Sequence, residues 1–542
     1  MSLSHFSFIT EEVIDRARFY SSVLFCLLSC LFLSCTPSTP PADLTFVNGS
    51  EPQSLDPGLI TGQLEGRLCR ALFEGLTRYN QKADIVPGAA ESWKVSTDST
   101  VYTFKIREDA FWSDGLPVTA EDFVLSWKRV LTPETAAEYA YILYFIKNAE
   151  AYHRGELHDF TQVGIKATSE KTLEVTLKAP TPFFLYLTAF PTYFPVPLRA
   201  IEAHADAWGL PGKIITNGPY LLESWKIRDR VTLVKNQDYW DAERVQLNRI
   251  DSLITDKATT AFNLYATGLS DLIVDKNMVP QHIITALKDR PDFHSYTYMG
   301  TYYYRFNVTR EPLNDPRVRQ ALSAAIDRQR IIDKITKAGE QPATSFTPPN
   351  VAGYQPPDGI AYHPEQAQAL LAQAGYPNGT RFPRLSLLYN KSELHEKIAI
   401  EVQAMWKQVL GIQVDLANQE WATYLDSMKN LKYDIARSSW IGDYPDPNTF
   451  LDCFITGGGN NRTGWSRDEY DQAIEKANQT NDPKERLAIF YDAETLLVKE
   501  DPPIAPLFFY SGILFYDQNK IGGIEPNVLA EHPLDQMFIK ED

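Results

Sequence analysis

Residues 385–440 read LSLLYNKSELHEKIAIEVQAMWKQVLGIQVDLANQEWATYLDSMKNLKYDIARSSW, a stretch in which strand-like and helix-like patterns alternate. Residues 385–388 are expected to form a buried strand, and Ser392 is expected to cap a helix whose apolar residues recur at helical spacing. Alternation over residues 412–416 predicts a second strand, and a short helix is expected before a third strand at residues 433–440. This βαβαβ succession predicts a parallel sheet.

The end of the third strand carries two opposite charges, Arg437 and Asp443, six residues apart around a tryptophan. Ligands of open parallel sheets gather beyond the carboxyl ends of the strands. His395 is expected in the first helical turn after a strand, where an anion is favoured. Two opposite charges on one groove wall suit a zwitterion such as a short peptide. Ordinary turn chemistry is an alternative, because Asp before Tyr-Pro is common in turns.

The rest of the chain also mixes strands and helices. Residues 101–106 alternate as a strand, and Thr119 is expected to cap a helix. Asp315-Pro316 is a strong helix start, and this helix is expected to continue to about Gly339. Together the patterns predict a mixed α/β protein with several sheets.

Length, charge and cysteine content restrict the class of protein. A chain of 542 residues is expected to form roughly two to four domains. The formal net charge of −17 argues against a nucleic-acid partner, because phosphates require a basic face. Only Cys69 and Cys453 follow residue 35, so the core rather than a disulfide framework is expected to hold the chain. The sequence leaves open whether these two cysteines pair.

Residues 1–35 have the features of a signal peptide. Two arginines precede an uncharged apolar run, residues 23–33, which is shorter than the roughly 20 residues that span a bilayer. The Ser-Cys pair that follows resembles the bacterial lipoprotein box, and by that resemblance Cys35 is the lipidated first residue of the mature chain. A second box ending at Cys30 and a plain secretory leader with incidental cysteines are alternatives.

The common catalytic signatures are missing from the sequence. It contains no G-x-S-x-G motif, and the H-E-x-x-H pattern that His395 opens is broken by Ala399. The glycines at 457–459 lack the Lys-Ser/Thr of a phosphate loop. The nine histidines lack metal-ligand spacing, so neither a metal nor a cofactor is expected. Carboxylate pairs for glycoside hydrolysis stay open by spacing alone, but no motif supports an enzyme.

A series of motifs extends from about Thr45 to the C-terminus. It includes Leu72-Phe73-Glu74-Gly75-Leu76, Trp112-Ser113-Asp114-Gly115, Thr216-Asn217-Gly218-Pro219-Tyr220, Ala325-Ile326-Asp327-Arg328 and Asn418-Gln419-Glu420-Trp421. In kind and order these motifs resemble the bacterial oligopeptide-binding proteins of ABC importers, which belong to family 5 of the extracellular solute-binding proteins. The resemblance covers nearly the whole mature chain.

The resemblance implies an α/β fold of the periplasmic-binding-protein type, in which two lobes close like a hinge over a buried ligand and an extra domain is added. Lobe I would be discontinuous and the extra domain would follow its first segment. The implied segments are 36–80, 198–300 and 511–542 for lobe I, 81–197 for the extra domain, and 301–510 for lobe II.

The resemblance also implies which residues meet the two ends of a peptide. Asp443 matches the aspartate that receives the α-ammonium group. Arg437 and His395 match basic residues that meet the carboxylate of ligands of different length. His395 has an alternative role as a surface residue in a helix cap.

Four further positions match residues that line the ligand chamber. Trp421, Trp440 and Tyr139 match its aromatic residues, and Ser439 matches a strand position that pairs with the peptide backbone. Core packing is an equal alternative for the two tryptophans, because tryptophans in sheets are usually buried. Tyr139 lies in an aromatic run that is also consistent with a plain helix face.

The function implied by the resemblance is a non-catalytic receptor. It would capture short peptides in extended form on the outer side of the cytoplasmic membrane, as a monomer held by a lipid at Cys35, and deliver them to an ABC permease. A receptor specialised for murein-derived peptides is the alternative within the family. An envelope hydrolase and a chaperone-like binder are alternatives from other classes.

Overall fold

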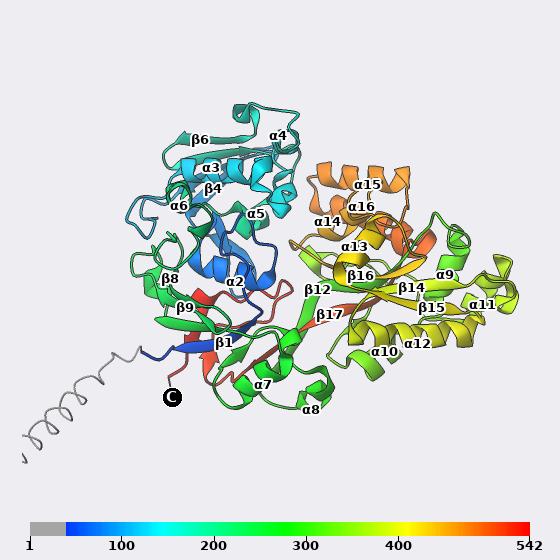
Figure 1. Ribbon diagram of the computed structural model, residues 1–542. Helices are drawn as coiled ribbons and strands as arrows, with labels where there is room; N and C mark the ends of the chain where they lie inside the picture. Colours follow the sequence, from blue (N-terminus) through cyan, green and yellow to red (C-terminus); the bar gives the residue numbers. More distant parts are fainter. Residues whose placement is uncertain (1–39, 542) are drawn as a thin grey trace, which may run out of the picture. The chain divides into compact units, whose positions relative to one another are not determined.

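The computed structural model describes residues 40–541, so the signal peptide and Cys35 lie outside the described residues. Eleven described strands form one mixed sheet (Figure 1). Ten of them follow one another in the order β15 (Val414–Gln419), β14 (Leu385–Asn390), β16 (Ile435–Ile441), β12 (Phe293–Phe306), β17 (Ile504–Tyr516), β11 (Leu272–Ile273), β1 (Leu44–Gly49), β10 (Arg249–Ile254), β9 (Arg230–Lys235) and β8 (Tyr220–Lys226). The eleventh, β13 (Gln341–Pro342), pairs with β17.

The βαβαβ succession predicted for residues 385–440 is confirmed. Strand β14 pairs in parallel with both β15 and β16, and helices α12 (Glu393–Leu410) and α13 (Trp421–Lys429) connect them. The Ser392 side chain caps α12 by accepting a hydrogen bond from the backbone N–H of His395. The sheet as a whole is not parallel, because β16 pairs in antiparallel fashion with β12 on its other side.

Strands β12 and β17 are the two longest strands, and they pair with each other along most of their length. Their register is interrupted between Thr297 and Thr301, which pair with Ser511 and Phe509. Three residues of β12 therefore stand opposite a single residue of β17, Tyr510. Such a bulge re-aims side chains and bends a strand.

A separate four-stranded antiparallel sheet is formed by β4 (Ala90–Val95), β5 (Val101–Ile106), β7 (Thr172–Thr176) and β6 (Ile165–Ser169). Helix α3 (Ala120–Leu131) packs against it with Phe123, Trp127 and Val130 buried, as the sequence predicted. Thr119 and Asp122 form a reciprocal capping box at the start of α3.

The helix expected from Asp315 to about Gly339 is wrong in its extent. Helix α9 (Pro316–Ala324) begins at the predicted cap but ends at Ala324. A second helix, α10 (Arg328–Ile331), starts anew because the Asp327 side chain accepts a hydrogen bond from the N–H of Arg330. A wider helical turn over Ile332–Thr336 follows. An aspartate inside a helical pattern thus ended one helix and capped the next.

The remaining elements surround these sheets (Figure 1). The helices are α2 (Gln63–Leu72), α4 (Ala149–His153), α5 (Phe184–Leu187), α6 (Leu198–His204), α7 (Ala258–Ala266), α8 (Ile284–Leu287), α11 (Pro364–Gln373), α14 (Asn448–Leu451), α15 (Asp468–Gln479) and α16 (Pro483–Thr495), with a 3-10 segment at Glu138–Leu143. Two small hairpin-like pairs are formed by β2 (Thr77–Tyr79) with β3 (Ile85–Pro87), and by β18 (Ile521–Gly522) with β19 (Phe538–Ile539).

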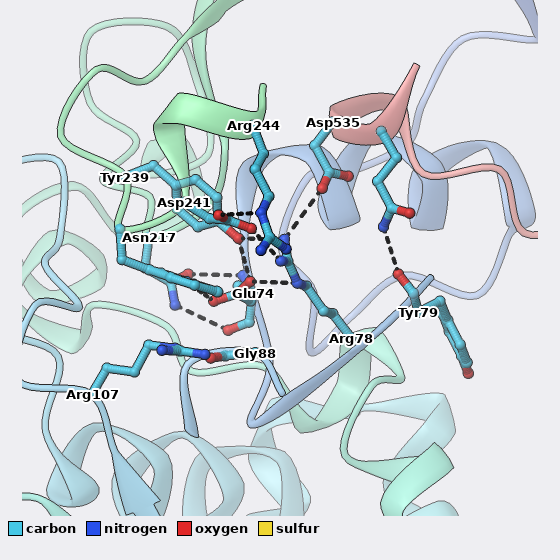
Figure 2. A network of polar contacts seen from close by, with 12 residues as sticks. Glu74, Arg78, Tyr79, Gly88, Arg107, Asn217, Tyr239, Asp241, Arg244 and Asp535 are labelled. Atoms are coloured by element: carbon cyan, nitrogen blue, oxygen red, sulfur yellow. Dashed lines mark hydrogen bonds and ion pairs between the residues drawn. The ribbon is translucent and has the colours of Figure 1, made fainter. Parts of the chain in front are cut away.

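A buried polar network joins segments that are far apart in the sequence (Figure 2). The Glu74 carboxylate accepts hydrogen bonds from Tyr239 and from Trp240 Nε1, the latter at 2.8 Å. Arg78 forms ion pairs with Asp241 and, at 3.4 Å, with Asp535. These contacts link three of the segments from which lobe I is predicted to be assembled. The division into lobes and an extra domain at the predicted boundaries stays a prediction.

Cys69 and Cys453 are both free and buried, so they do not pair. Among the described residues, no helix is both long and apolar enough to cross a membrane. Within residues 40–541, no three His, Cys, Asp or Glu side chains converge in a way that would hold a metal ion.

Candidate functional site

Asp443 lies in the turn after β16 and carries a largely enclosed charge. Its backbone N–H donates a hydrogen bond to the Thr449 hydroxyl at 3.1 Å. Among the described residues, none forms an ion pair with its carboxylate. Burial raises the pKa of Asp443 to about 7. A carboxylate in this state is stabilised by any cation that reaches it.

Two cavities meet at Asp443. The larger holds about 260 Å³ and is lined from one side by Ile441, Gly442 and Asp443, and from the other by residues that include Tyr139 and Tyr298. The smaller holds about 190 Å³ and continues from Asp443 along Trp440. Asp443 therefore lines both cavities.

Arg437 lies within β16, six residues before Asp443. Residues two apart on a strand share a face, so Arg437, Ser439 and Ile441 point to one side. The Arg437 side chain is 8% exposed. It donates hydrogen bonds to Asn390 Oδ1 at 3.3 Å and to the Tyr510 hydroxyl at 3.1 Å. Its Nε is buried without an acceptor, and no described acidic residue pairs with its charge.

His395 and Arg437 both contact the side chain of Tyr302. The Arg437 guanidinium lies 4.8 Å from the centre of the Tyr302 ring. The Tyr302 hydroxyl lies 3.4 Å from His395 Nδ1. Burial, followed by the positive charge of Arg437, lowers the pKa of His395 to about 3. The three side chains form a cluster in which Arg437 carries the positive charge. No acidic side chain of the described residues pairs with this charge, and a ligand carboxylate would suit it.

The structure places the other predicted residues as follows. Tyr139 lies in the 3-10 segment and lines the larger cavity. Its ring packs against Phe190 in a tilted arrangement, with ring centres 5.4 Å apart. Trp440 both packs against a hydrophobic core cluster and lines the smaller cavity, so packing and cavity lining coexist. Ser439 pairs with Tyr302 across β16 and β12. Trp421 begins α13, and its side chain lies outside what the structure describes.

The sequence did not point to Tyr302, Tyr510 and Asn390 as partners of Arg437. Tyr302 comes from β12 and Tyr510 from β17, strands more than 60 residues away that pair with or near β16 only in the folded sheet. The sequence offered one signal, the aromatic run Tyr302, Tyr303 and Tyr304. Such a run is equally typical of a strand buried in the hydrophobic core. Asp452, which lines the smaller cavity, was also missed.

Comparisons with known proteins found relatives that match most of the chain. The family described as "Bacterial extracellular solute-binding proteins, family 5 Middle" matches residues 84–462. The periplasmic oligopeptide-binding protein OppA of Salmonella typhimurium is 37% identical over 503 residues, which cover 91% of this chain and 91% of that protein. The periplasmic murein peptide-binding protein MppA of Escherichia coli strain K12 is 40% identical over 473 residues, covering 85% and 86%.

A crystal structure of a periplasmic oligopeptide-binding protein, OppAIV from Borrelia burgdorferi, is similar to this chain throughout. It superposes with a TM-score of 0.79 at 36% sequence identity, covering 92% of this chain and 100% of that chain. The predicted fold class, the two-lobed α/β fold of periplasmic binding proteins, is confirmed.

Proposed function

The chain belongs to family 5 of the bacterial extracellular solute-binding proteins, and on this premise we propose that it captures short peptides outside the cytoplasmic membrane for an ABC importer. The observation that carries the proposal is a pair of enclosed, opposite charges without ion-pair partners among the described residues. These are Arg437 in β16 and Asp443 in the turn that follows this strand.

A peptide zwitterion matches this pair of charges. Its α-ammonium group has three N–H donors for Asp443, and its carboxylate suits the cluster of Arg437 and His395. Six residue steps at about 3.3 Å each separate the two ends by roughly 20 Å before side-chain reach is subtracted. This span suits an extended peptide of roughly three to five residues.

Broad sequence tolerance follows from binding through backbone and termini. A peptide laid along β16 near Ser439 would gain hydrogen bonds that are independent of its side chains. Water in the cavities adapts to different side chains. Length would be restricted more strongly than sequence, because the two terminal charges are fixed on one strand.

The partners and location follow from the same proposal. Binding across two lobes stabilises a closed form, which a permease would recognise. The chain would act as a monomer on the outer side of the membrane, held by a lipid at Cys35, and would turn over no substrate. The similarity to a murein peptide-binding protein keeps a cell-wall peptide as the second candidate ligand.

The test is to identify what the purified protein carries. Ligands released by denaturation are analysed by mass spectrometry, and an unliganded preparation is titrated with tripeptides by calorimetry. A mixed population of short peptides is the expected result, while one cell-wall species would favour the second candidate. Absence of tripeptide binding, or steady hydrolysis of peptide or glycan by the pure protein, would overturn the proposal.

A further inference from the structure

The smaller cavity beside Asp443 is a pocket of the size of one side chain. It holds about 190 Å³, somewhat more than a cavity of about 150 Å³ that accepts a benzene ring. Aromatic side chains form part of its wall, namely Tyr141, Tyr144, Phe145, Trp440 and Tyr444. The indole Nε1 of Trp440 is buried without an acceptor among the described residues. The wall therefore offers a hydrogen bond that no described group receives.

Asp452 adds a second carboxylate to this pocket. It begins the turn after α14 and lines the same cavity as Asp443. Its side-chain carboxylate accepts one hydrogen bond from the described residues, a long one of 3.5 Å from Asn448 Nδ2. By contrast, the neighbouring Asp446 is neutralised by a buried ion pair with Arg486 at 2.7 Å. Asp452 therefore adds a second carboxylate, which forms no ion pair with a described residue.

Lys178 also lines the pocket, and its positive charge would oppose the two carboxylates if it were equally enclosed. Its Nζ lies 5.9 Å from the centre of the Phe145 ring and forms no ion pair with a described residue. Lys178 is exposed, so water and salt screen its charge. The carboxylates of Asp443 and Asp452 are more enclosed and are screened less.

We propose that Asp452 is a specificity-determining residue, which selects a lysine or arginine side chain on the first residue of the bound peptide. The inference rests on the proposed peptide-binding function and deepens it. Once the α-ammonium is held at Asp443, the first side chain starts one carbon away, at the junction of the two cavities. The cavity with aromatic walls and the second carboxylate favours a long apolar stem with a cationic end.

Calorimetry with Lys-Ala-Ala and norleucine-Ala-Ala tests this inference, since the two peptides have similar stems and differ in the terminal charge. Wild type is expected to bind the lysine peptide about tenfold more tightly. In Asp452→Asn the two affinities should agree within about twofold, with the norleucine peptide unaffected. Glu469→Gln removes an exposed negative charge on α15 and should leave the tenfold ratio unchanged.

The outcomes separate this inference from the function on which it rests. If wild type binds neither peptide, the proposed function fails. If wild type binds both equally, or if Asp452→Asn keeps the tenfold ratio, the function stands and the specificity assignment is overturned. Asp452→Lys supplies a second test, because the preference should reverse toward Glu-Ala-Ala. The wild-type ratio alone decides the matter if a variant fails to fold.

Discussion

Asp443 and Arg437 are unusual residues because each buries a charge without forming an ion pair with a described residue. Burying an ion costs several kcal/mol unless a partner compensates it. Proteins usually avoid this cost by supplying the partner themselves, as Asp446 and Arg486 do here. A site with two opposite charges that lack partners therefore favours a ligand that carries a complementary charge for each.

Removing the charge of Asp443 should weaken peptides according to their amino terminus. Asp443→Asn keeps the size of the side chain but loses the charge-assisted hydrogen bond, which is typically worth about 1.5 to 3 kcal/mol. We expect the affinity for a free-amine tripeptide to fall at least about tenfold, and that for its N-acetyl analogue to change little. Calorimetry on both ligands measures the difference. Equal affinities of wild type and variant for the free-amine peptide would refute the assignment.

The raised pKa of Asp443 also predicts a pH dependence of binding. Burial raises this pKa to about 7, so the folded, ligand-free protein holds a proton more tightly than the unfolded chain. The contribution of this bound proton to the free energy of unfolding is present at low pH and is lost as the pH rises through about 7. Peptide binding needs the ionised form, so affinity should rise about tenfold from pH 5.5 to 7.0. A flat profile for wild type, or an equal slope in Asp443→Asn, would contradict this.

At the scale of elements, helices and caps that depend on neighbouring residues could be predicted from the sequence. The pairing of strands that are far apart in the chain could not. The capping box of α3 and the Ser392 cap of α12 depend on residues three positions apart, and both were predictable. The split of the helix after Asp315 was missed, because an aspartate fits both a helix and a cap. The antiparallel pairing of β16 with β12 joins strands about 130 residues apart, which no local pattern encodes.

The same limit applies to the site. Arg437 and Asp443 were located at a strand end from sequence, because strand and turn patterns are local. The aromatic partner Tyr302 and the acceptor Tyr510 could not be found, since they reach Arg437 only through the pairing of strands. Asp452 was hidden for a similar reason, because its exposure to a cavity depends on Tyr141 and Phe145 from a distant segment.

The turn that carries Asp443 is anchored to α16 by a bidentate ion pair. Arg486 Nη1 and Nη2 contact the two carboxylate oxygens of Asp446 at 2.7 and 2.8 Å, and both residues are buried. Arg486→Met leaves the Asp446 charge buried and unpaired, so we expect a loss of about 3 to 5 kcal/mol in the free energy of unfolding. Urea denaturation measures it.

An exposed ion pair provides the matched control for this prediction. Lys397 and Glu393 lie one turn apart on α12 and are both exposed, so Lys397→Met should cost at most about 0.5 kcal/mol. Peptide affinity in folded Arg486→Met should also fall, because the turn no longer fixes Asp443. A change in stability no larger than that of the control would show that the pair does not anchor the turn.

At the scale of the whole molecule, the central pair of strands connects the parts that the predicted boundaries divide. Strands β12 and β17 continue across residues 300 and 510, where lobe II is predicted to meet lobe I. The bulge at Tyr298, Met299 and Gly300 lies at this point. A second register shift follows between Tyr302 and Tyr303. We expect this pair of strands to act as the pivot, since a few residues absorb the change in backbone angles when lobes close.

Tyr444 links the ligand site to this closure. It follows Asp443 directly and is 4% exposed. Its ring stacks on Phe183, with ring centres 4.1 Å apart and an angle of 9° between planes. Phe183 lies in the segment predicted as the extra domain and Tyr444 in the segment predicted as lobe II, so at those boundaries the contact would join the two. We expect an ammonium group bound at Asp443 to hold the next residue, Tyr444, against Phe183.

Removing this ring should weaken binding without touching the charges of the site. Stacked aromatic pairs contribute about 0.5 to 1.5 kcal/mol beyond the area they bury, so Tyr444→Ala is expected to reduce tripeptide affinity about tenfold while Tyr444→Phe binds nearly as wild type. Tyr491→Ala removes an exposed ring from α16 and serves as the control. Small-angle X-ray scattering should show less compaction on peptide addition for Tyr444→Ala than for wild type. If Tyr444→Ala binds and compacts as wild type does, closure depends on other contacts and Tyr444 is only a packing residue.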